Sequence, residues 1–285
     1  MITEKPEEFD IGQIAASGQC FRMDRLEEGR YAVKAGSRYL ELEQDRDRLL
    51  LCCSREEFED FWKQYFDLET DYGAVRRRVD GSDTYLTEAA EFGKGIRILR
   101  QDLWEMVITF LVTQQNNIRR IRRIIELLCE KYGEKKACPA DCIGQSYYTF
   151  PMAARLAEAS EDELRACNLG YRARYVKKTA RQVADGQLDL SAIRGMEYLQ
   201  AREELLKCCG VGEKVADCIC LFGLHALQAF PVDTHIRQIL ERHYPEGFPF
   251  EKYEGCEGII QQYLFYYDLR LLRTRPARSG VPFAT

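Results

Sequence analysis

Hydrophobic and polar positions alternate strictly only in the first part of the chain. Leu40 and Leu42 alternate with Tyr39 and Glu41, and an apolar run at residues 49–53 follows a charged turn. A period of two is typical of an antiparallel sheet with one buried face. We therefore predict strands and turns up to about residue 53.

From residue 54 onward the apolar positions recur at the spacing of a helix. Ser54 and Glu57 form the pattern of a capping box, in which a serine oxygen and a glutamate satisfy free amides at a helix start. The nearly unbroken apolar residues 103–112 follow Asp102 and predict a buried central helix. Further helices are expected from Ile118 to about Gly133, from a second capping box at Ser160 to Gly170, after Tyr171, and from about Gly258 to Leu272.

These periods together predict an α+β fold that is mainly α, in which a small N-terminal antiparallel β-sheet packs on a helical body. We assign residues 1–80 to the sheet domain, which also has short helices, and residues 81–285 to the helical domain. No low-complexity linker and no internal repeat interrupts the sequence.

The composition is that of a globular protein large enough to bury a sizeable core. Of the 285 residues, 46% are apolar and 31% are charged, and no apolar run approaches the roughly 18 residues that cross a bilayer. The first residues, MITEKPEEFD, lack the features of a signal peptide. Several of the twelve cysteines, such as Cys129, Cys218 and Cys220, lie in apolar helical segments. We therefore expect reduced thiols in an intracellular protein without a membrane segment.

The net charge of -5 argues weakly against binding by overall electrostatics, but basic residues are concentrated locally. They form three groups: Arg97, Arg100, Arg119, Arg120, Arg122 and Arg123; Arg172, Arg174, Lys177, Lys178 and Arg181; and Arg270, Arg273, Arg275 and Arg278. Such groups suit a nucleic-acid-binding face. Taken alone, any one group is explained better as a solvated helix surface.

Candidate chemistry is concentrated in residues 205–236. Two helical segments are separated there by Gly210-Val211-Gly212, which permit the tight backbone that a hairpin between two helices requires, over about residues 201–224. Amides at the start of the second helix carry partial positive charge and favour a phosphate. Alone, a Gly-x-Gly turn is weak evidence for a phosphate-binding hairpin. Its place between two apolar helices makes the evidence more specific.

Lys214 lies in the first turn of that second helix, and Asp233 lies beyond its end. The positive end of the helix dipole and partial desolvation disfavour an ammonium ion at Lys214, which favours a nucleophilic amine. Asp233 precedes a further helix as its N-cap, and a carboxylate held there can stabilise positive charge on a sugar or help to move protons. A phosphate-binding lysine and a simple cap are the plain alternatives for each residue alone. Capping does not explain why this lysine and this aspartate both occur at one helix after a Gly-Val-Gly hairpin.

Six segments stand out along the chain. They are GQCFRM at residues 18–23, GIRILRQD at 95–102, QNNIRRI at 115–121, LGYRARYV at 169–176, GVGEKVADCICL at 210–221 and PVDTHI at 231–236. In this order they resemble the helix-hairpin-helix DNA glycosylases, and specifically the 8-oxoguanine DNA glycosylase family. The resemblance covers most of the chain, and LGYRARYV with GEKVADC is highly specific.

The resemblance implies a bifunctional DNA glycosylase and AP lyase with a helix-hairpin-helix motif in its helical domain. Lys214 would attack the deoxyribose C1′ after or as the damaged base departs, and the resulting Schiff base would permit β-elimination of the 3′ phosphate. Asp233 would assist. This chemistry needs no metal and no organic cofactor. The expected partner is double-stranded DNA containing 8-oxoguanine, preferably opposite cytosine, and we expect a monomer.

The resemblance also implies a pocket for a base turned out of the duplex, at a cost of about a few kcal/mol. Phe265 and Cys218 would contact the two faces of the base, and Gln261 would contact its Watson–Crick edge. Gly18 would offer its carbonyl to the N7–H of 8-oxoguanine. Guanine has an acceptor at N7, so the facing carbonyl would disfavour guanine by about 1–3 kcal/mol.

Further matching positions are implied to contact the DNA. They are Gln115, Asn116, Asn117, Arg120, Tyr171 and Arg172 near the orphaned cytosine, and Gly210, Val211, Gly212 and His235 along the backbone. Gln115 departs from the asparagine usual in related enzymes, which puts strict selection of cytosine in doubt. Cys208-Cys209 replaces the usual Leu-Pro and should alter hairpin rigidity. For His235, a structural role at a helix end fits the sequence almost as well as a contact with the DNA backbone. His225 and His243 look like loop or surface residues.

Other classes compete with this interpretation. A noncatalytic helix-hairpin-helix module would grip phosphate but would need neither Lys214 nor Asp233. A glycosylase for another damaged base, such as a monofunctional alkylbase glycosylase, would usually lack the lysine. A metal hydrolase is disfavoured because the three histidines show no ligand spacing, and Cys256 stands alone near the C-terminus, so no iron–sulfur cluster is predicted.

Overall fold

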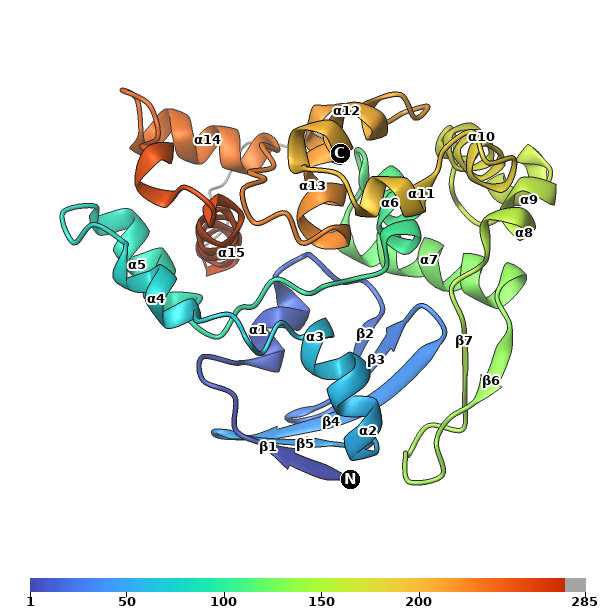
Figure 1. Cartoon of the computed structure of the whole chain (residues 1–285), viewed down its shortest axis with the longest axis horizontal. Coiled ribbons are helices and arrows are strands. Elements are labelled where there is room, and N and C mark those ends of the chain that lie inside the picture. Colours follow the sequence, from blue (N-terminus) through green and yellow to red (C-terminus); the bar gives the residue numbers. More distant parts are fainter. Residues whose placement is uncertain (275–285) are drawn as a thin grey trace.

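A computed structural model describes the backbone of residues 1–274 and the side chains of residues 1–271. Figure 1 shows a small sheet beside a larger body of helices, so the predicted α+β, mainly α, fold is confirmed. In the third basic group, Arg275, Arg278 and the side chain of Arg273 lie outside the described residues. Within the described part of the chain, no helix is long and apolar enough to cross a membrane.

The larger sheet has five antiparallel strands in the order β1-β5-β4-β3-β2. They are β1 (Ile2–Glu4), β2 (Met23–Glu27), β3 (Arg30–Ala35), β4 (Arg38–Asp45) and β5 (Arg48–Leu51). The prediction of strands up to about residue 53 is correct for the sheet but missed helix α1 (Ile11–Ala16). Asp10 caps this helix, its carboxylate accepting a hydrogen bond from the amide of Gln13 at 2.9 Å.

Both faces of this sheet are covered, although the alternation predicted one buried face. Leu40 and Leu42 pack into the core on one face, and Glu41 is buried on the other, beneath a second, two-stranded sheet. The strands of this hairpin are β6 (Lys135–Ala137) and β7 (Ser146–Tyr148). The hairpin extends beside the sheet in Figure 1, and the Gly144 amide at its turn donates to the Glu41 carboxylate at 2.8 Å. A segment distant in sequence buries this face, so local alternation could not reveal it.

Apart from α1, the helices follow the five-stranded sheet in the sequence. The short ones are α2 (Arg55–Glu57), the π-helical turn η1 (Phe58–Trp62), α3 (Lys63–Tyr65), α4 (Tyr72–Arg77) and α5 (Thr84–Phe92). The helical body consists of α6 (Leu103–Thr113), α7 (Ile118–Tyr132), α8 (Ala153–Glu158), α9 (Glu161–Arg165), α10 (Arg172–Ala184), α11 (Leu190–Arg194), α12 (Tyr198–Leu206), α13 (Glu213–Gly223), α14 (Thr234–His243), the 3-10 turn η2 (Phe250–Tyr253) and α15 (Glu257–Thr274).

The two predicted capping boxes differ in outcome. At Ser160 both reciprocal hydrogen bonds are present. At Ser54 the serine oxygen accepts from the Glu57 amide, but the Glu57 carboxylate accepts from the indole of Trp62 at 3.0 Å. The Glu57 carboxylate therefore bonds the indole of Trp62 instead of a free amide at the helix start.

The predicted buried central helix is α6. All of its residues from Leu103 to Val112 except Trp104 are buried. It contacts α7, α10, α11 and α13, and it lies beside α13 in Figure 1. The helix that begins at the Gly-Val-Gly turn therefore packs on the buried central helix of the body.

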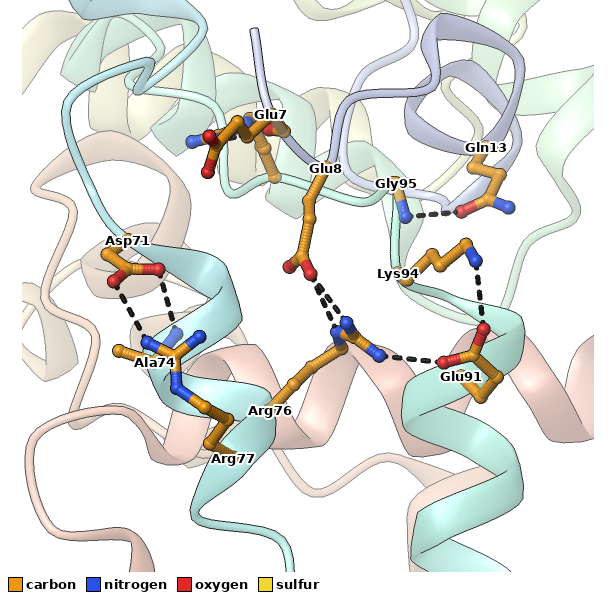
Figure 2. Close-up of polar contacts among 11 residues, drawn as sticks. Glu7, Glu8, Gln13, Asp71, Ala74, Arg76, Arg77, Glu91, Lys94 and Gly95 are labelled. Atoms are coloured by element: carbon orange, nitrogen blue, oxygen red, sulfur yellow. Dashed lines mark hydrogen bonds and ion pairs between the residues drawn. The ribbon is translucent and has the colours of Figure 1, made fainter.

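Polar contacts attach the N-terminal segment to the helices, as Figure 2 shows. Arg76 of α4 donates to Glu8 at 2.6 Å and to Glu91 of α5 at 2.7 Å. The amide of Gly95 donates to the side chain of Gln13 in α1 at 3.0 Å. These contacts fix α1, and with it the following loop at Gly18, relative to the helical body.

A buried carboxylate joins the loop after α13 to the turn that follows α3. His225, predicted to be a loop or surface residue, lies in a loop but is buried, with Nε2 3.1 Å from Oδ2 of Asp67. Arg100 and Tyr72 also donate to Asp67, each at 2.9 Å. Burial raises the pKa of Asp67, but the nearby His225 imidazole and the hydrogen bonds from Arg100 and Tyr72 outweigh it and lower the pKa to about 2. His243 is exposed, as predicted.

Candidate active site

Lys214 lies in the first turn of α13, as the sequence predicts, with Gly212 as the N-cap. Its ammonium group lies over the ring of Phe110, 5.6 Å from the ring centroid. Phe110 comes from α6 and stacks on Phe222 of α13, with ring centroids 5.5 Å apart. A buried aromatic pair that joins the two helices therefore orients the lysine side chain.

Cys218 lies one turn beyond Lys214 and is buried. Burial raises the pKa of its thiol to about 11, and the nearby Lys214 ammonium partly offsets this through its charge and a hydrogen bond. The carboxylate of Asp233 raises the pKa of the same thiol. Lys214 and Asp233 are therefore both near enough to act electrostatically on the Cys218 thiol, which is neutral at neutral pH.

Asp233 is the N-cap of α14, as predicted, and its carboxylate accepts a hydrogen bond from the Ile236 amide at 2.9 Å. His235 faces α15. Its Nδ1 lies 3.9 Å from Oδ2 of Asp268, and its ring meets the ring of Phe265 edge-on at 6.0 Å. The imidazole is 42% exposed, so this position accommodates both a DNA contact and a structural role at the helix end.

The loop at Gly18 lies against Phe265 of α15, and Gly18 has the left-handed φ of +81°. Gln261 lies one turn before Phe265 and is buried. Its Nε2 donates to the carbonyl of Pro231 at 3.0 Å, and its Oε1 accepts from Gln262 at 3.1 Å. The structure thus brings Gly18 and Phe265 together and fixes the orientation of the Gln261 amide.

Two buried glutamines that sequence reasoning missed fix the loop before β2. The side chain of Gln19 accepts from the Leu99 amide at 2.8 Å and donates to the Arg97 carbonyl at 2.9 Å. Gln101 donates to the Gln19 carbonyl at 2.9 Å, and its own amide donates to the Phe222 carbonyl at 3.0 Å. Both glutamines lie in segments singled out from the sequence, but only the fold reveals that those segments are adjacent.

The two asparagines shape the turn between α6 and α7. Asn117 is the N-cap of α7 and accepts from the Arg120 amide at 3.0 Å. Asn116 donates to the Val112 carbonyl and accepts from the Asn117 amide, both at 3.0 Å. Their side chains hold the backbone, whereas Arg120 and Tyr171 are exposed.

Arg172 is buried, only 3% exposed, although the sequence suggested a contact with DNA. Its Nε donates to the Gln114 carbonyl at 2.8 Å, and its Nη2 donates to the Gln115 carbonyl at 2.9 Å. Its Nη1 donates to the Leu169 carbonyl at 3.4 Å. The guanidinium stacks on the ring of Tyr171, 4.5 Å from the centroid. Arg172 therefore lies beside Gln115 but is bound to the protein backbone.

Helices α12 and α13 form the predicted hairpin. Gly210 has φ of +87°, and a β-carbon there would lie 2.5 Å from Cγ of Tyr175. Val211 is buried, whereas a β-carbon at Gly212 would meet nothing within 4 Å. The ring of Tyr175 therefore requires glycine at the first position, and the second glycine leaves open space at the helix start.

Asp217, another residue that the sequence analysis missed, holds the two hairpin helices together. Its carboxylate accepts from the Tyr198 hydroxyl at 2.8 Å and from Nε of Arg202 at 2.6 Å. Its position in an apolar helical run gave no indication of these partners. The contacts fix α12 against α13, and therefore fix the helix that carries Lys214.

The basic groups divide into surface and interior residues. Exposed members on α7 and α10 are Arg119, Arg120, Arg123, Arg174, Lys178 and Arg181. Arg97, by contrast, is buried and donates to the Glu7 carbonyl at 2.7 Å, so it does not belong to a surface group. The twelve cysteines are free thiols, and no group of three or more His, Cys, Asp or Glu side chains among the described residues is arranged to hold a metal.

Known proteins match the chain along most of its length. The family described as 8-oxoguanine DNA glycosylase, N-terminal domain, matches residues 1–107, and the HhH-GPD superfamily of base excision DNA repair proteins matches residues 108–248. The N-glycosylase/DNA lyase of Saccharomyces cerevisiae is 30% identical over 266 residues, 83% of this chain and 69% of that protein. A probable N-glycosylase/DNA lyase of Methanothermobacter thermautotrophicus is 31% identical over 245 residues, 76% of this chain and 75% of that protein.

A solved structure extends the similarity to the fold. The 8-oxoguanine glycosylase/lyase of Clostridium acetobutylicum, in complex with double-stranded DNA containing cytosine opposite 8-oxoguanine, superposes with a TM-score of 0.87. It is 34% identical, and the alignment covers 95% of this chain and 98% of that chain.

Proposed function

Because this chain belongs to the 8-oxoguanine DNA glycosylase family of the HhH-GPD superfamily and is a DNA glycosylase and lyase, we propose that it excises 8-oxoguanine from duplex DNA, preferably opposite cytosine, and then cleaves the strand. The observations that carry the proposal are Lys214 in the first turn of α13, held over the ring of Phe110, and Asp233 fixed as the N-cap of α14. A nucleophilic amine, a fixed carboxylate and a neutral pocket wall are the parts that this chemistry requires.

In the proposed reaction the amine of Lys214 forms a bond to C1′ of the extruded nucleotide. The bond between C1′ and the base breaks, and the base leaves with the electron pair and takes up a proton. The carboxylate of Asp233 stabilises the positive charge that develops on the sugar. Its hydrogen bond from the Ile236 amide fixes its position before the substrate arrives.

Strand cleavage follows from the covalent adduct. Opening of the sugar ring converts the adduct into a protonated Schiff base between Lys214 and C1′. The iminium withdraws electrons, so a proton can be removed from C2′ and the bond from C3′ to its phosphate oxygen breaks. This chain's own residues supply the nucleophile and the charge stabilisation, and we propose that no cofactor takes part.

Base recognition is proposed to combine stacking with hydrogen bonds. The extruded base would lie between Phe265 and the neutral thiol of Cys218, with the fixed amide of Gln261 at its Watson–Crick edge. The carbonyl of Gly18 would accept from N7–H of 8-oxoguanine. Guanine has no proton at N7, and the unsatisfied pair would cost about 1–3 kcal/mol.

The loop between α6 and α7 is proposed to lie at the gap that the extruded base leaves. Its residues and those at the start of α10 would face the orphaned cytosine, and the hairpin would bind the backbone. The opposite-base group comprises Gln115, Asn116, Asn117, Arg120, Tyr171 and Arg172, and the backbone group comprises Gly210, Val211, Gly212 and His235. We propose that the enzyme acts as a monomer.

Excision from a panel of duplexes tests the substrate. Each duplex has one damaged base opposite cytosine, and both base release and strand cleavage are measured. We expect 8-oxoguanine to be released fastest and its strand to be cut. Faster release of an alkylated base without strand cleavage would favour a monofunctional alkylbase glycosylase, and binding without release would favour a noncatalytic hairpin module.

A further inference from the structure

Gln114 connects two parts of the proposed DNA-binding surface. It is the C-cap of α6, and its Nε2 donates to the carbonyl of Gly210 in the hairpin at 2.9 Å. Its own carbonyl accepts from Nε of Arg172 at 2.8 Å and also from Nη2. One residue therefore bonds the hairpin with its side chain and α10 with its backbone.

The next residue, Gln115, has a backbone conformation that non-glycine residues seldom adopt. Its φ is +45°, in the left-handed region, where a β-carbon is strained. Nη2 of Arg172 donates to its carbonyl at 2.9 Å. Since Arg172 is buried and each of its three nitrogens donates to a backbone carbonyl, its guanidinium holds this turn in place.

A second contact closes the connection between the hairpin and α10. The ring of Tyr175 lies directly against Gly210, at the place where any other residue would have a β-carbon. Tyr175 and Arg172 both belong to the first turns of α10. Gln114, Gly210, Tyr175 and Arg172 thus form a closed ring of contacts around the turn at Gln115.

We propose that Gln114 and Arg172 are positioning residues that set the turn at Gln115 relative to the hairpin. When the hairpin binds the DNA backbone, Gln115 is then already placed at the gap left by the extruded base. Arg172 acts through Gln115 by holding its carbonyl, and it remains in the proposed opposite-base group beside the exposed Arg120. This role rests on the proposed function.

Gln114→Glu tests the proposal because it keeps the size of the side chain and removes the donor. The control is Gln187→Glu, which adds the same charge at an exposed glutamine in the loop after α10. Single-turnover excision of 8-oxoguanine is measured in one duplex with cytosine opposite and in another with an abasic position opposite. Loss of one hydrogen bond should slow the first reaction about tenfold, while the second, with no base to contact across the gap, should change less than about twofold.

The outcomes separate positioning from a merely structural role. Equal slowing on both duplexes, or no slowing on either, would overturn the proposal. If Gln114→Glu does not fold, Gln114→Met removes the donor without adding charge and must give the same pattern. Wild-type protein that releases no 8-oxoguanine would instead overturn the proposed function itself.

Discussion

A β-carbon added at Gly18 would lie 3.2 Å from Cε1 of Phe265, so the backbone of the N-terminal loop and a ring of the last helix are in direct contact. The two residues come from opposite ends of the described chain. Gln19 and Gln101 fix the loop against the helical body, and α15 carries the ring. The proposed pocket for the base therefore depends on the docking of the two parts of the molecule.

Gly18→Ala should impair base excision more than lyase activity. At φ of +81° an alanine is strained, and its methyl group would press on Phe265, which is proposed to stack on the base. We expect excision of 8-oxoguanine to slow about tenfold or more, while cleavage at a preformed abasic site, which needs no base pocket, changes little. Gly186→Ala is the matched control, because Gly186 has φ of +70° and open space around it. Equal losses in both activities would contradict this account of the pocket.

Gly210→Ala and Gly212→Ala should differ in their effect on stability, because the two glycines of the hairpin have different surroundings. Alanine at Gly210 combines a φ of +87° with a β-carbon 2.5 Å from the ring of Tyr175, whereas alanine at Gly212 meets nothing within 4 Å. We expect the first change to lower the free energy of unfolding by about 2 kcal/mol and the second by less than about 1 kcal/mol. Urea denaturation measures both, and a larger effect at Gly212 would show that the packing of Tyr175 does not determine this turn.

Asp67 should make the stability of the fold depend on acid pH. Its pKa in the fold is lowered from the usual 3.8 to about 2, so its carboxylate stabilises the fold above about pH 4 and loses this effect as pH falls through about 2. Between pH 5 and pH 2 the free energy of unfolding of wild type should fall by about 2 kcal/mol more than that of Asp67→Asn. Parallel pH dependences of the two proteins would refute the role of the contacts with His225 and Arg100.

Cys218 should not titrate in the working range of the enzyme. Burial raises the pKa of its thiol to about 11, so the group stays neutral between pH 6 and pH 9. Wild type and Cys218→Ser should therefore have pH–rate profiles of the same shape over that range, even if their absolute rates differ. An alkaline limb that is present in wild type and absent from Cys218→Ser would mean that the thiol ionises.

The sequence predicted those features that local pattern determines. The central helix α6 follows from its nearly unbroken apolar residues and the cap at Asp102. The hairpin follows from Gly210 and Gly212, and Asp233 was recognised as a cap from the extended residues before it. These features depend on neighbours within a few residues, so periodicity and capping chemistry suffice to find them.

Features that depend on contacts between distant segments were missed. Glu41 reads as an exposed strand position, but the β6–β7 hairpin buries it. Nothing in the sequence indicated that the carbonyls that end α6 bind the guanidinium of Arg172. Gln19 and Asp217 carry no local signal, because their partners lie on other elements. A buried polar side chain acquires its role only when the fold supplies its partners.

Trapping with borohydride tests most directly the central claim that Lys214 is the nucleophile. Borohydride reduces a Schiff base to a stable bond, so protein incubated with 8-oxoguanine-containing duplex should become covalently attached to the DNA. The control variant is Lys207→Gln, at an exposed lysine of the same hairpin that pairs with Glu204 at 2.6 Å. We predict that wild type and Lys207→Gln are trapped and that Lys214→Gln is not. Trapping that survives in Lys214→Gln would contradict the assignment.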